Sequence, residues 1–268
     1  MLARTSVEVA LMKRGALLAV MLCCIGAGRA IAVPRSFVQP PILMYHRIDT
    51  RYPHVPFGRV LTVSPAAFAA QLLYLRQRRI SALSMAQFEE RMQREQPLHD
   101  VVVLTFDDGY ADQYRYALPV LRSMGDGATF YIVTGKIGKP GHLTWKMLRT
   151  MRADGMDIAG HGVTHDDLTT LSIGHQRAEI FGCVRSLRQH LAVPVLSYAY
   201  PSGRFDAGTI ALVRAAGIPF ALTTDRQYVR PPQNRYELTR LRIVGSWTLA
   251  DFARRLRIAR SAQPRVLR

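Results

Sequence analysis

Short runs of apolar, β-branched and aromatic residues recur along this chain and alternate with longer amphipathic stretches. The amphipathic stretches carry helix signals, such as Ser64 followed by Pro65 at the start of residues 64–79, a pair typical of a capped helix N-terminus. Alternating strands and helices predict a parallel sheet, and continuously apolar strands predict that both of its faces are covered. The predicted strands are residues 41–46, 101–106, 128–133, 156–161, 195–200, 220–224 and 237–243.

The number of these strand–helix units, and the lack of a glycine-rich loop after the first strand, favour a barrel over a doubly wound sheet. We therefore predict an α/β fold, a distorted and incomplete (β/α)7 barrel. A chain of 268 residues that is 49% hydrophobic can bury one sizeable core, and barrels of this length commonly form one domain. No composition shift, internal repeat or low-complexity tract indicates a second domain, so we expect a single one.

Titratable and polar side chains gather at the ends of the predicted strands. The C-terminal ends of barrel strands are where active sites form in this architecture, whereas a merely solvated surface would distribute such residues over both ends. We therefore expect these side chains to share one rim of the barrel. The residues concerned are His46, Asp107, Asp108, His161, His165, Tyr200, Pro201 and Asp225.

Two imidazoles and one carboxylate suit a divalent transition metal and leave positions open for water and substrate. Asp108, His161 and His165 form such a set, and the neighbouring Asp107 is then available as a general base. Each signal has a structural alternative: an H-x-x-x-H is weak evidence in a chain with eight histidines, an Asp-Asp-Gly is often a turn, and His46 suits a packing role.

The first 32 residues have the pattern of a secretory signal. Lys13 and Arg14 precede a short apolar run at 16–27, and Ala30-Ile31-Ala32 suits signal-peptidase cleavage. We expect residues 1–32 to be a cleaved signal, 33–260 the folded domain and 261–268 a mobile tail, with no transmembrane segment after cleavage. A retained membrane anchor is the alternative. The protein is accordingly expected to be exported and periplasmic, secreted or cell-surface associated.

The chain has a formal net charge of +17, and its first 32 residues contribute four basic residues and one acidic residue, which leaves +14 for the rest. Charge alone suggests nucleic acid, but no nucleic-acid motif is present and no nucleic-acid partner is expected. Attraction to an anionic cell surface or acidic polymer fits an exported protein better. Cys183 is the one cysteine beyond the expected signal, so an internal disulfide is excluded there.

The motifs LTFDDGY, HGVTH and AYPSG together resemble those of the polysaccharide deacetylases, the NodB-like proteins of carbohydrate esterase family 4. PILMYHRID, SPAAFAAQLLYLRQR and LTRLRI resemble the branch that removes acetyl groups from poly-β-1,6-N-acetylglucosamine in biofilm matrices. The resemblance extends over residues 41–256, and it implies a metal-dependent hydrolase that acts on an acetylated polysaccharide.

Carried over position by position, the resemblance implies that Asp107 is the catalytic base. It also implies that Asp108, His161 and His165 bind the metal, most simply zinc, with cobalt or nickel as alternatives. No histidine follows His190 in this chain, as in the biofilm branch, where a histidine of the N-terminal Tyr-His motif replaces the usual late acid. His46 is therefore the expected general acid.

The resemblance implies that Tyr200, Pro201 and Ser202 line the substrate groove and offer a backbone N–H to the oxyanion. Ser202 stands where the family usually has an aromatic residue, which affects the expected sugar contacts. Ala199 occupies the position of an arginine that orients the base in many members. Arg240 is a candidate substitute, with a structural ion pair as the alternative.

The expected reaction is the hydrolysis of N-acetyl groups on an exopolysaccharide that contains N-acetylglucosamine, with poly-β-1,6-N-acetylglucosamine as the expected polymer. The alternatives are peptidoglycan, another acylated polysaccharide, or a non-catalytic role in carbohydrate binding. Loss of a base or ligand would mark the last alternative, and this sequence retains all four of Asp107, Asp108, His161 and His165.

Overall fold

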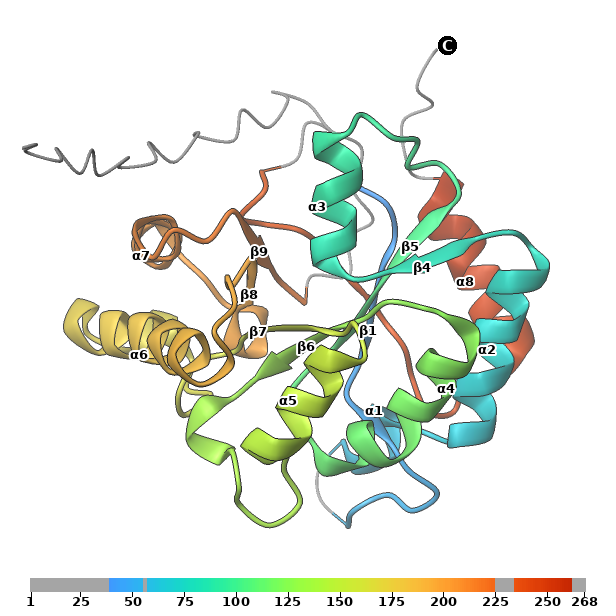
Figure 1. Ribbon diagram of the computed structural model, residues 1–268, viewed down its shortest axis with the longest axis horizontal. Coiled ribbons are helices and arrows are strands. Elements are labelled where there is room, and N and C mark those ends of the chain that lie inside the picture. The colour runs from blue at the N-terminus through green and yellow to red at the C-terminus, as the bar shows by residue number, and fades with distance from the viewer. Residues whose placement is uncertain (1–38, 55–56, 225–233, 262–268) are drawn as a thin grey trace, which may run out of the picture. The chain divides into compact units, whose positions relative to one another are not determined.

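The computed structural model describes residues 39–54, 57–224 and 234–261. An eight-stranded parallel sheet forms the centre of this part of the chain (Figure 1), and two further short strands pair separately as a ribbon. The sheet contains β1 (Ile42–Tyr45), β4 (Ser81–Leu83), β5 (Val101–Phe106), β6 (Thr129–Ile132), β7 (Asp157–Gly160), β8 (Ser197–Ala199), β9 (Phe220–Leu222) and β10 (Leu241–Arg242). The ribbon pairs β2 (Arg47–Ile48) with β3 (Thr62–Val63).

The strands of the sheet follow the order β10-β1-β5-β6-β7-β8-β9, with β4 paired to the start of β5. All seven predicted strands are present, and β2, β3 and β4 are additional. The last segment nearly closes the ring, because Leu238 bridges Leu222 of β9 while β10 pairs with β1 a few residues later. The predicted incomplete (β/α)7 barrel is confirmed, since the closure rests on two short contacts instead of a full strand.

The amphipathic stretch predicted at residues 64–79 is helical, and helices surround the strands (Figure 1). They are α1 (Gly58–Leu61), α2 (Pro65–Gln77), α3 (Met85–Gln93), α4 (Leu118–Met124), α5 (Trp145–Ala153), α6 (Ile173–Leu191), α7 (Ala207–Ala215) and α8 (Leu249–Ser261). A π-helical turn, η1 (Gln113–Ala117), leads into α4, and η2 (Thr134–Lys136), η3 (Leu168–Thr170) and η4 (Pro201–Gly203) are 3₁₀ turns.

The helix boundaries follow capping chemistry that the sequence carries. The Ser64 hydroxyl accepts a hydrogen bond from the Ala67 N–H at 3.1 Å, and Pro65 occupies the first helical position of α2, as predicted. Ser84 forms a reciprocal capping box with Gln87 at the start of α3. Such caps satisfy N–H groups that lack intrahelical acceptors and each contributes about 1 kcal/mol.

Alternate residues of each strand face two different cores, as the period of a strand requires. Leu104, Phe106 and Phe130 face the helices, and the rings of Phe106 and Phe130 stack with centroids 4.7 Å apart. Residues of the other set, such as Val103, face the barrel interior together with Phe88 of α3. Burying one such phenylalanine stabilises the fold by about 2–3 kcal/mol.

Helix α3 covers the N-terminal ends of the strands. The Met85 N–H donates to the Thr129 hydroxyl at the start of β6, and that hydroxyl donates in turn to Asp157 at the start of β7. The interior is therefore plugged at this end. The predicted site lies at the opposite, C-terminal ends of the strands.

The expected signal, residues 1–32, lies outside the described residues, as do Asp225 of the predicted rim and residues 262–268 of the expected tail. Ser261 still belongs to α8, so the terminal helix continues one residue beyond the expected domain boundary. Within the described ranges, none of the helices is both long and apolar enough to cross a membrane.

Candidate active site

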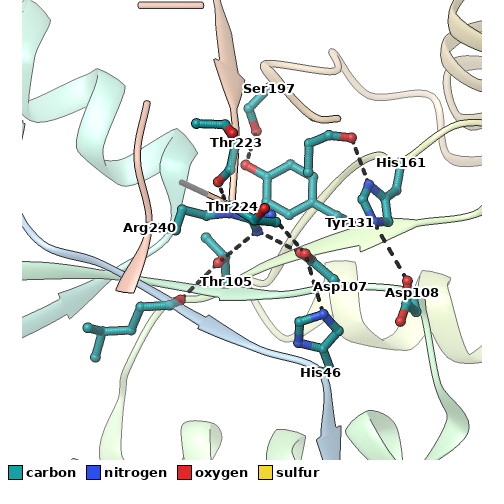
Figure 2. Close-up of polar contacts among 12 residues, drawn as sticks. His46, Thr105, Asp107, Asp108, Tyr131, His161, Ser197, Thr223, Thr224 and Arg240 are labelled. Carbon is teal, nitrogen blue, oxygen red and sulfur yellow. Dashed lines mark hydrogen bonds and ion pairs between the residues drawn. The ribbon is translucent and has the colours of Figure 1, made fainter. Parts of the chain in front are cut away.

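The barrel topology brings the sequence-predicted residues to one end of the sheet. His46 directly follows β1, Asp107 and Asp108 directly follow β5, and His161 directly follows β7. Because the paired strands are parallel, their C-terminal ends lie at the same edge. Figure 2 shows the resulting cluster, with Arg240 and His46 reaching Asp107 from different sides.

Asp107 and Arg240 form a buried, two-point ion pair. The two terminal guanidinium nitrogens of Arg240 donate to Oδ1 and Oδ2 of Asp107 at 2.7 and 2.8 Å. The Arg240 Nε donates to the Thr223 carbonyl at 3.0 Å, which fixes the plane of the guanidinium. A fork of parallel N–H groups holds a carboxylate in one orientation. The geometry therefore supports a base-orienting role for Arg240, the candidate substitute for the arginine that is usual at the position of Ala199.

The charge of Arg240 also decides the ionisation of Asp107. Burial by itself raises the pKa of this carboxyl, since desolvation penalises the charged form. The positive charge and hydrogen bonds of Arg240 outweigh burial and hold the pKa of Asp107 well below its usual range. Asp107 is consequently an ionised carboxylate that can accept a proton.

His46 lies on the other side of this carboxylate, with its Nε2 4.0 Å from Asp107 Oδ2. Burial lowers the pKa of His46, and the negative charges of Asp107 and Asp108 partly oppose that shift. The His46 Nδ1 has no hydrogen-bond partner among the described residues. The ring is thus available to exchange a proton near Asp107, which supports the acid role predicted from its position.

Asp108, His161 and His165 form a compact set whose ligand atoms all lie within 4.8 Å of one another. Asp108 Oδ1 lies 3.3 Å from His165 Nε2 and 3.6 Å from His161 Nε2. His161 Nδ1 lies 2.7 Å from the Ala199 carbonyl. A carbonyl only accepts, so Nδ1 carries the proton and Nε2 keeps the lone pair that a metal needs. The set therefore fits a divalent ion of the zinc type.

Two of these ligands sit in left-handed backbone, which few side chains adopt without strain. Asp108 has φ +71° and His165 has φ +79°. Aspartate tolerates this region better than most residues, and strained residues of this kind cluster at functional sites. Gly109 follows at φ +70°, where an added Cβ would also press on Ile132, so the turn after Asp108 requires glycine.

Glu179 of α6 holds the loop between the two histidines. Its Oε2 accepts from the backbone N–H groups of Val163 and Thr164 at 2.8 and 2.9 Å, and its Oε1 accepts from the Thr164 hydroxyl at 3.1 Å. Sequence reasoning missed this residue. The available signal was an acidic side chain on the buried face of α6, beside Ile180 and Cys183, where a carboxylate needs partners.

Of the three residues in the segment predicted to offer a backbone N–H to the oxyanion, Ser202 alone remains a candidate donor. The Tyr200 N–H is already bonded to the Leu222 carbonyl at 3.0 Å, and Pro201 has no N–H. Ser202 is exposed and adopts left-handed backbone at φ +55°. Among the described residues no acceptor outside η4 is found for its N–H, so Ser202 is the candidate donor of this segment.

A groove of about 610 Å³ adjoins Ser202. Its lining is mainly hydroxyl-bearing, and includes Thr169, Ser202, Arg204, Thr223, Thr224 and Glu237. Such a lining suits the hydroxyl groups of a sugar chain. A hollow of about 740 Å³ on the outer face, between η1, α4 and α5, contains none of the predicted site residues.

Tyr110 lies beside the ligand set, with the Arg47 guanidinium 4.3 Å from its ring centroid and its hydroxyl close to Asp108. Burial and the charge of Asp108 raise the pKa of Tyr110, so this phenol stays protonated and can donate to the carboxylate. The Tyr110 phenol can thus help to fix the orientation of the Asp108 carboxylate.

Comparisons with known proteins agree with this geometry. The family model described as polysaccharide deacetylase matches residues 94–221, which include the predicted base and ligands, whereas His46 and Arg240 lie outside the match. The chain is 29% identical over 204 residues to the "Putative polysaccharide deacetylase YxkH" of Bacillus subtilis (strain 168), covering 76% of this chain and 71% of that protein. It is 23% identical over 225 residues to the poly-β-1,6-N-acetyl-D-glucosamine N-deacetylase of Staphylococcus epidermidis (strain RP62A), covering 74% and 77%.

Among solved structures, the Streptococcus pyogenes deacetylase PplD in complex with acetate superposes with a TM-score of 0.75 at 29% identity, covering 82% of this chain and 98% of that one. The fold, the motif residues brought to one rim and the relatives all agree. Residues 94–221 therefore match the polysaccharide deacetylase family, and the chain is similar over most of its length to hydrolases of that family.

Proposed function

We propose that this protein is a metal-dependent N-deacetylase of an exopolysaccharide that contains N-acetylglucosamine, with poly-β-1,6-N-acetylglucosamine as the substrate. The observation that carries the proposal is one juxtaposition. An ionised Asp107, fixed by Arg240 at 2.7 and 2.8 Å, lies between His46 and the set of Asp108, His161 and His165.

The ligand set would hold a divalent ion, and zinc is the metal that two imidazoles and a carboxylate with open positions suit best. Such an ion, when bound, polarises a carbonyl oxygen and lowers the pKa of water. The hydrogen bond from His161 to the Ala199 carbonyl orients the first imidazole, and Glu179 orders the loop that delivers the second.

The protein's own groups then account for both proton transfers. Asp107 takes a proton from the attacking water as its oxygen bonds to the acetyl carbon. The Ser202 N–H donates to the carbonyl oxygen, where negative charge develops. His46 donates a proton to the amide nitrogen as the C–N bond breaks. Acetate and a glucosamine unit leave, and the freed amine is cationic at neutral pH.

The choice of polymer rests on two supports. A relative that matches 74% of this chain is named as a poly-β-1,6-N-acetyl-D-glucosamine N-deacetylase, and the groove beside Ser202 has a hydroxyl-rich lining. Export, as expected from residues 1–32, would deliver the enzyme to such a polymer. The net charge of +14 that remains beyond residues 1–32 favours association with anionic cell surfaces, which would weaken as ionic strength rises.

Acetate release from three substrates tests the proposal. Zinc-loaded protein is incubated with β-1,6-linked N-acetylglucosamine oligomers, β-1,4-linked chitin oligomers and peptidoglycan fragments, with the His46→Ala variant alongside. The proposal predicts that the β-1,6 oligomers lose acetate fastest and that the variant is slower by about 10²–10⁴-fold. If another substrate is turned over faster, the proposed polymer is wrong. If the His46→Ala variant keeps full activity, a residue other than His46 is the acid. Binding without turnover would favour a non-catalytic role.

A further inference from the structure

The Gln113 side chain joins the two residues proposed to move protons. Its amide nitrogen lies 2.6 Å from the His46 carbonyl and 2.6 Å from the Asp107 carbonyl. Both contacts are to carbonyls, which only accept, so the nitrogen and not the oxygen of the amide must face them. Gln113 is completely buried, and its amide oxygen has no partner among the described residues. The two donations are therefore its polar contribution to this site.

The position of these carbonyls explains why a donor is needed there. The β1–β5 ladder ends with the pair Tyr45 and Phe106, so His46 and Asp107 are the next residues beyond it. A buried carbonyl without a donor is costly. The two N–H groups of one amide replace the missing rung and tie the ends of both strands together.

The neighbouring residue strengthens the same link. Asp112 Oδ1 accepts from the Ile48 N–H at 3.0 Å, and its Oδ2 pairs with Arg47 at 2.9 Å. Asp112 and Gln113 thus bind three consecutive residues, 46–48, from the start of η1. This turn is π-helical, and single π turns within helices are frequent at functional sites.

We propose that Gln113 is a positioning residue that sets the separation between the acid His46 and the base Asp107. The inference rests on the roles proposed above for those two residues. Arg240 fixes the Asp107 carboxylate independently, whereas the 4.0 Å contact with Asp107 is the one polar contact of the His46 ring among the described residues. Loss of Gln113 therefore displaces His46 more than Asp107, and impairs proton donation more than substrate binding.

Gln113→Met tests this inference, because methionine keeps the approximate volume and removes both donors. Gln176→Met is the matched control, since Gln176 is also buried and its amide donates to the Leu171 carbonyl at 3.2 Å. Both zinc-loaded variants are compared with the unsubstituted protein in three respects: kcat and KM on N-acetylglucosamine oligomers, zinc content, and the NMR signals of the histidine rings.

Gln113→Met is expected to lower kcat by about 100-fold, the loss that a displacement of roughly 1 Å causes, with KM and zinc content nearly unchanged. In a His46→Ala background the same substitution should lower kcat less than 5-fold, because the residue it positions is gone. The ring signals of His46 should shift while those of His161 and His165 stay. Gln176→Met should leave kcat and the His46 signals unchanged.

Equal losses of kcat in the two backgrounds, or unshifted His46 signals in folded Gln113→Met, would overturn the inference and leave Gln113 a structural residue. Absence of acetate release by the unsubstituted protein from any N-acetylated sugar would instead refute the proposed function. The NMR comparison needs no turnover, so it decides the role of Gln113 in that case as well.

Discussion

The guanidinium of Arg240 donates hydrogen bonds to both carboxylate oxygens of Asp107 at 2.7 and 2.8 Å, although Asp107 lies 133 positions earlier in the chain. Lysine would keep the charge and lose the fork. We predict that Arg240→Lys lowers kcat by about 10- to 100-fold, because the base is no longer held in one orientation. Steady-state kinetics at saturating zinc measures the effect.

Arg260→Lys is the control for that substitution, since Arg260 pairs with Asp100 at 2.8 Å on the exposed side of α8. Exposed pairs contribute about 0–1 kcal/mol, so this variant should match the unsubstituted protein in rate and stability. An Arg240→Lys enzyme with unchanged kcat would show that the pair is structural, which was the alternative that the sequence left open.

Glu179 provides a test of the loop between the proposed metal ligands His161 and His165. Glu179→Gln replaces an acceptor of two backbone N–H groups by an amide, which weakens the anchoring of Val163 and Thr164. We predict a loss of about 10- to 100-fold in zinc affinity, as for other groups that orient metal ligands, measured by chelator competition. Glu90→Gln, on the surface of α3 and paired with Arg94, should bind zinc normally.

Asp126 links stability to pH away from the site. Burial raises the pKa of this carboxyl from its ordinary 3.8 to about 6, so the folded state binds the proton more tightly than the unfolded state. Its contribution to stability is present below pH 4 and is lost as the pH rises through 6. Asp126→Asn should therefore raise the melting temperature at pH 8 by about 2–4 °C, corresponding to roughly 1 kcal/mol. The two proteins should melt alike near pH 4, and a stabilisation of equal size there would contradict the assignment.

Cys183 should resist thiol reagents in the native protein. Its side chain is fully buried, and burial raises the pKa of the thiol to about 12, so the reactive thiolate is scarce at neutral pH. Iodoacetamide labelling, followed by peptide mass spectrometry, should modify Cys183 only after denaturation. Rapid labelling of the native protein would show that the space between β7 and α6 opens readily.

The strands of the main sheet could be predicted because a strand buried on both faces leaves a continuous apolar run, as in 101–106. The short β4 was missed, since its three residues begin with an exposed serine and owe their conformation to pairing with β5. The π turn η1 was equally invisible, because α and π turns share the same amphipathic pattern over five residues.

The residues of the candidate site could likewise be predicted only in part. The candidate ligands and acid–base groups at strand ends could be named from their types and spacing, as with Asp108 and His161. The groups that hold them in place could not, because Gln113 and Glu179 act through backbone atoms of segments distant in sequence. Arg240 could be named from the sequence only as a candidate, because its contact with Asp107 is visible only in the structure. The candidate oxyanion donor narrows to Ser202 because the Tyr200 N–H is occupied.

The most direct test of a base beside a metal set compares Asp107→Asn with Asp108→Ala on β-1,6-linked N-acetylglucosamine oligomers. Zinc content is measured in the same samples. We predict that Asp107→Asn keeps its zinc and releases acetate about 10²–10⁴-fold more slowly. Asp108→Ala should lose both zinc and activity. Chelation should abolish acetate release by the unsubstituted protein until zinc is restored. Acetate release at the normal rate by Asp107→Asn, or by chelated protein, would contradict the account.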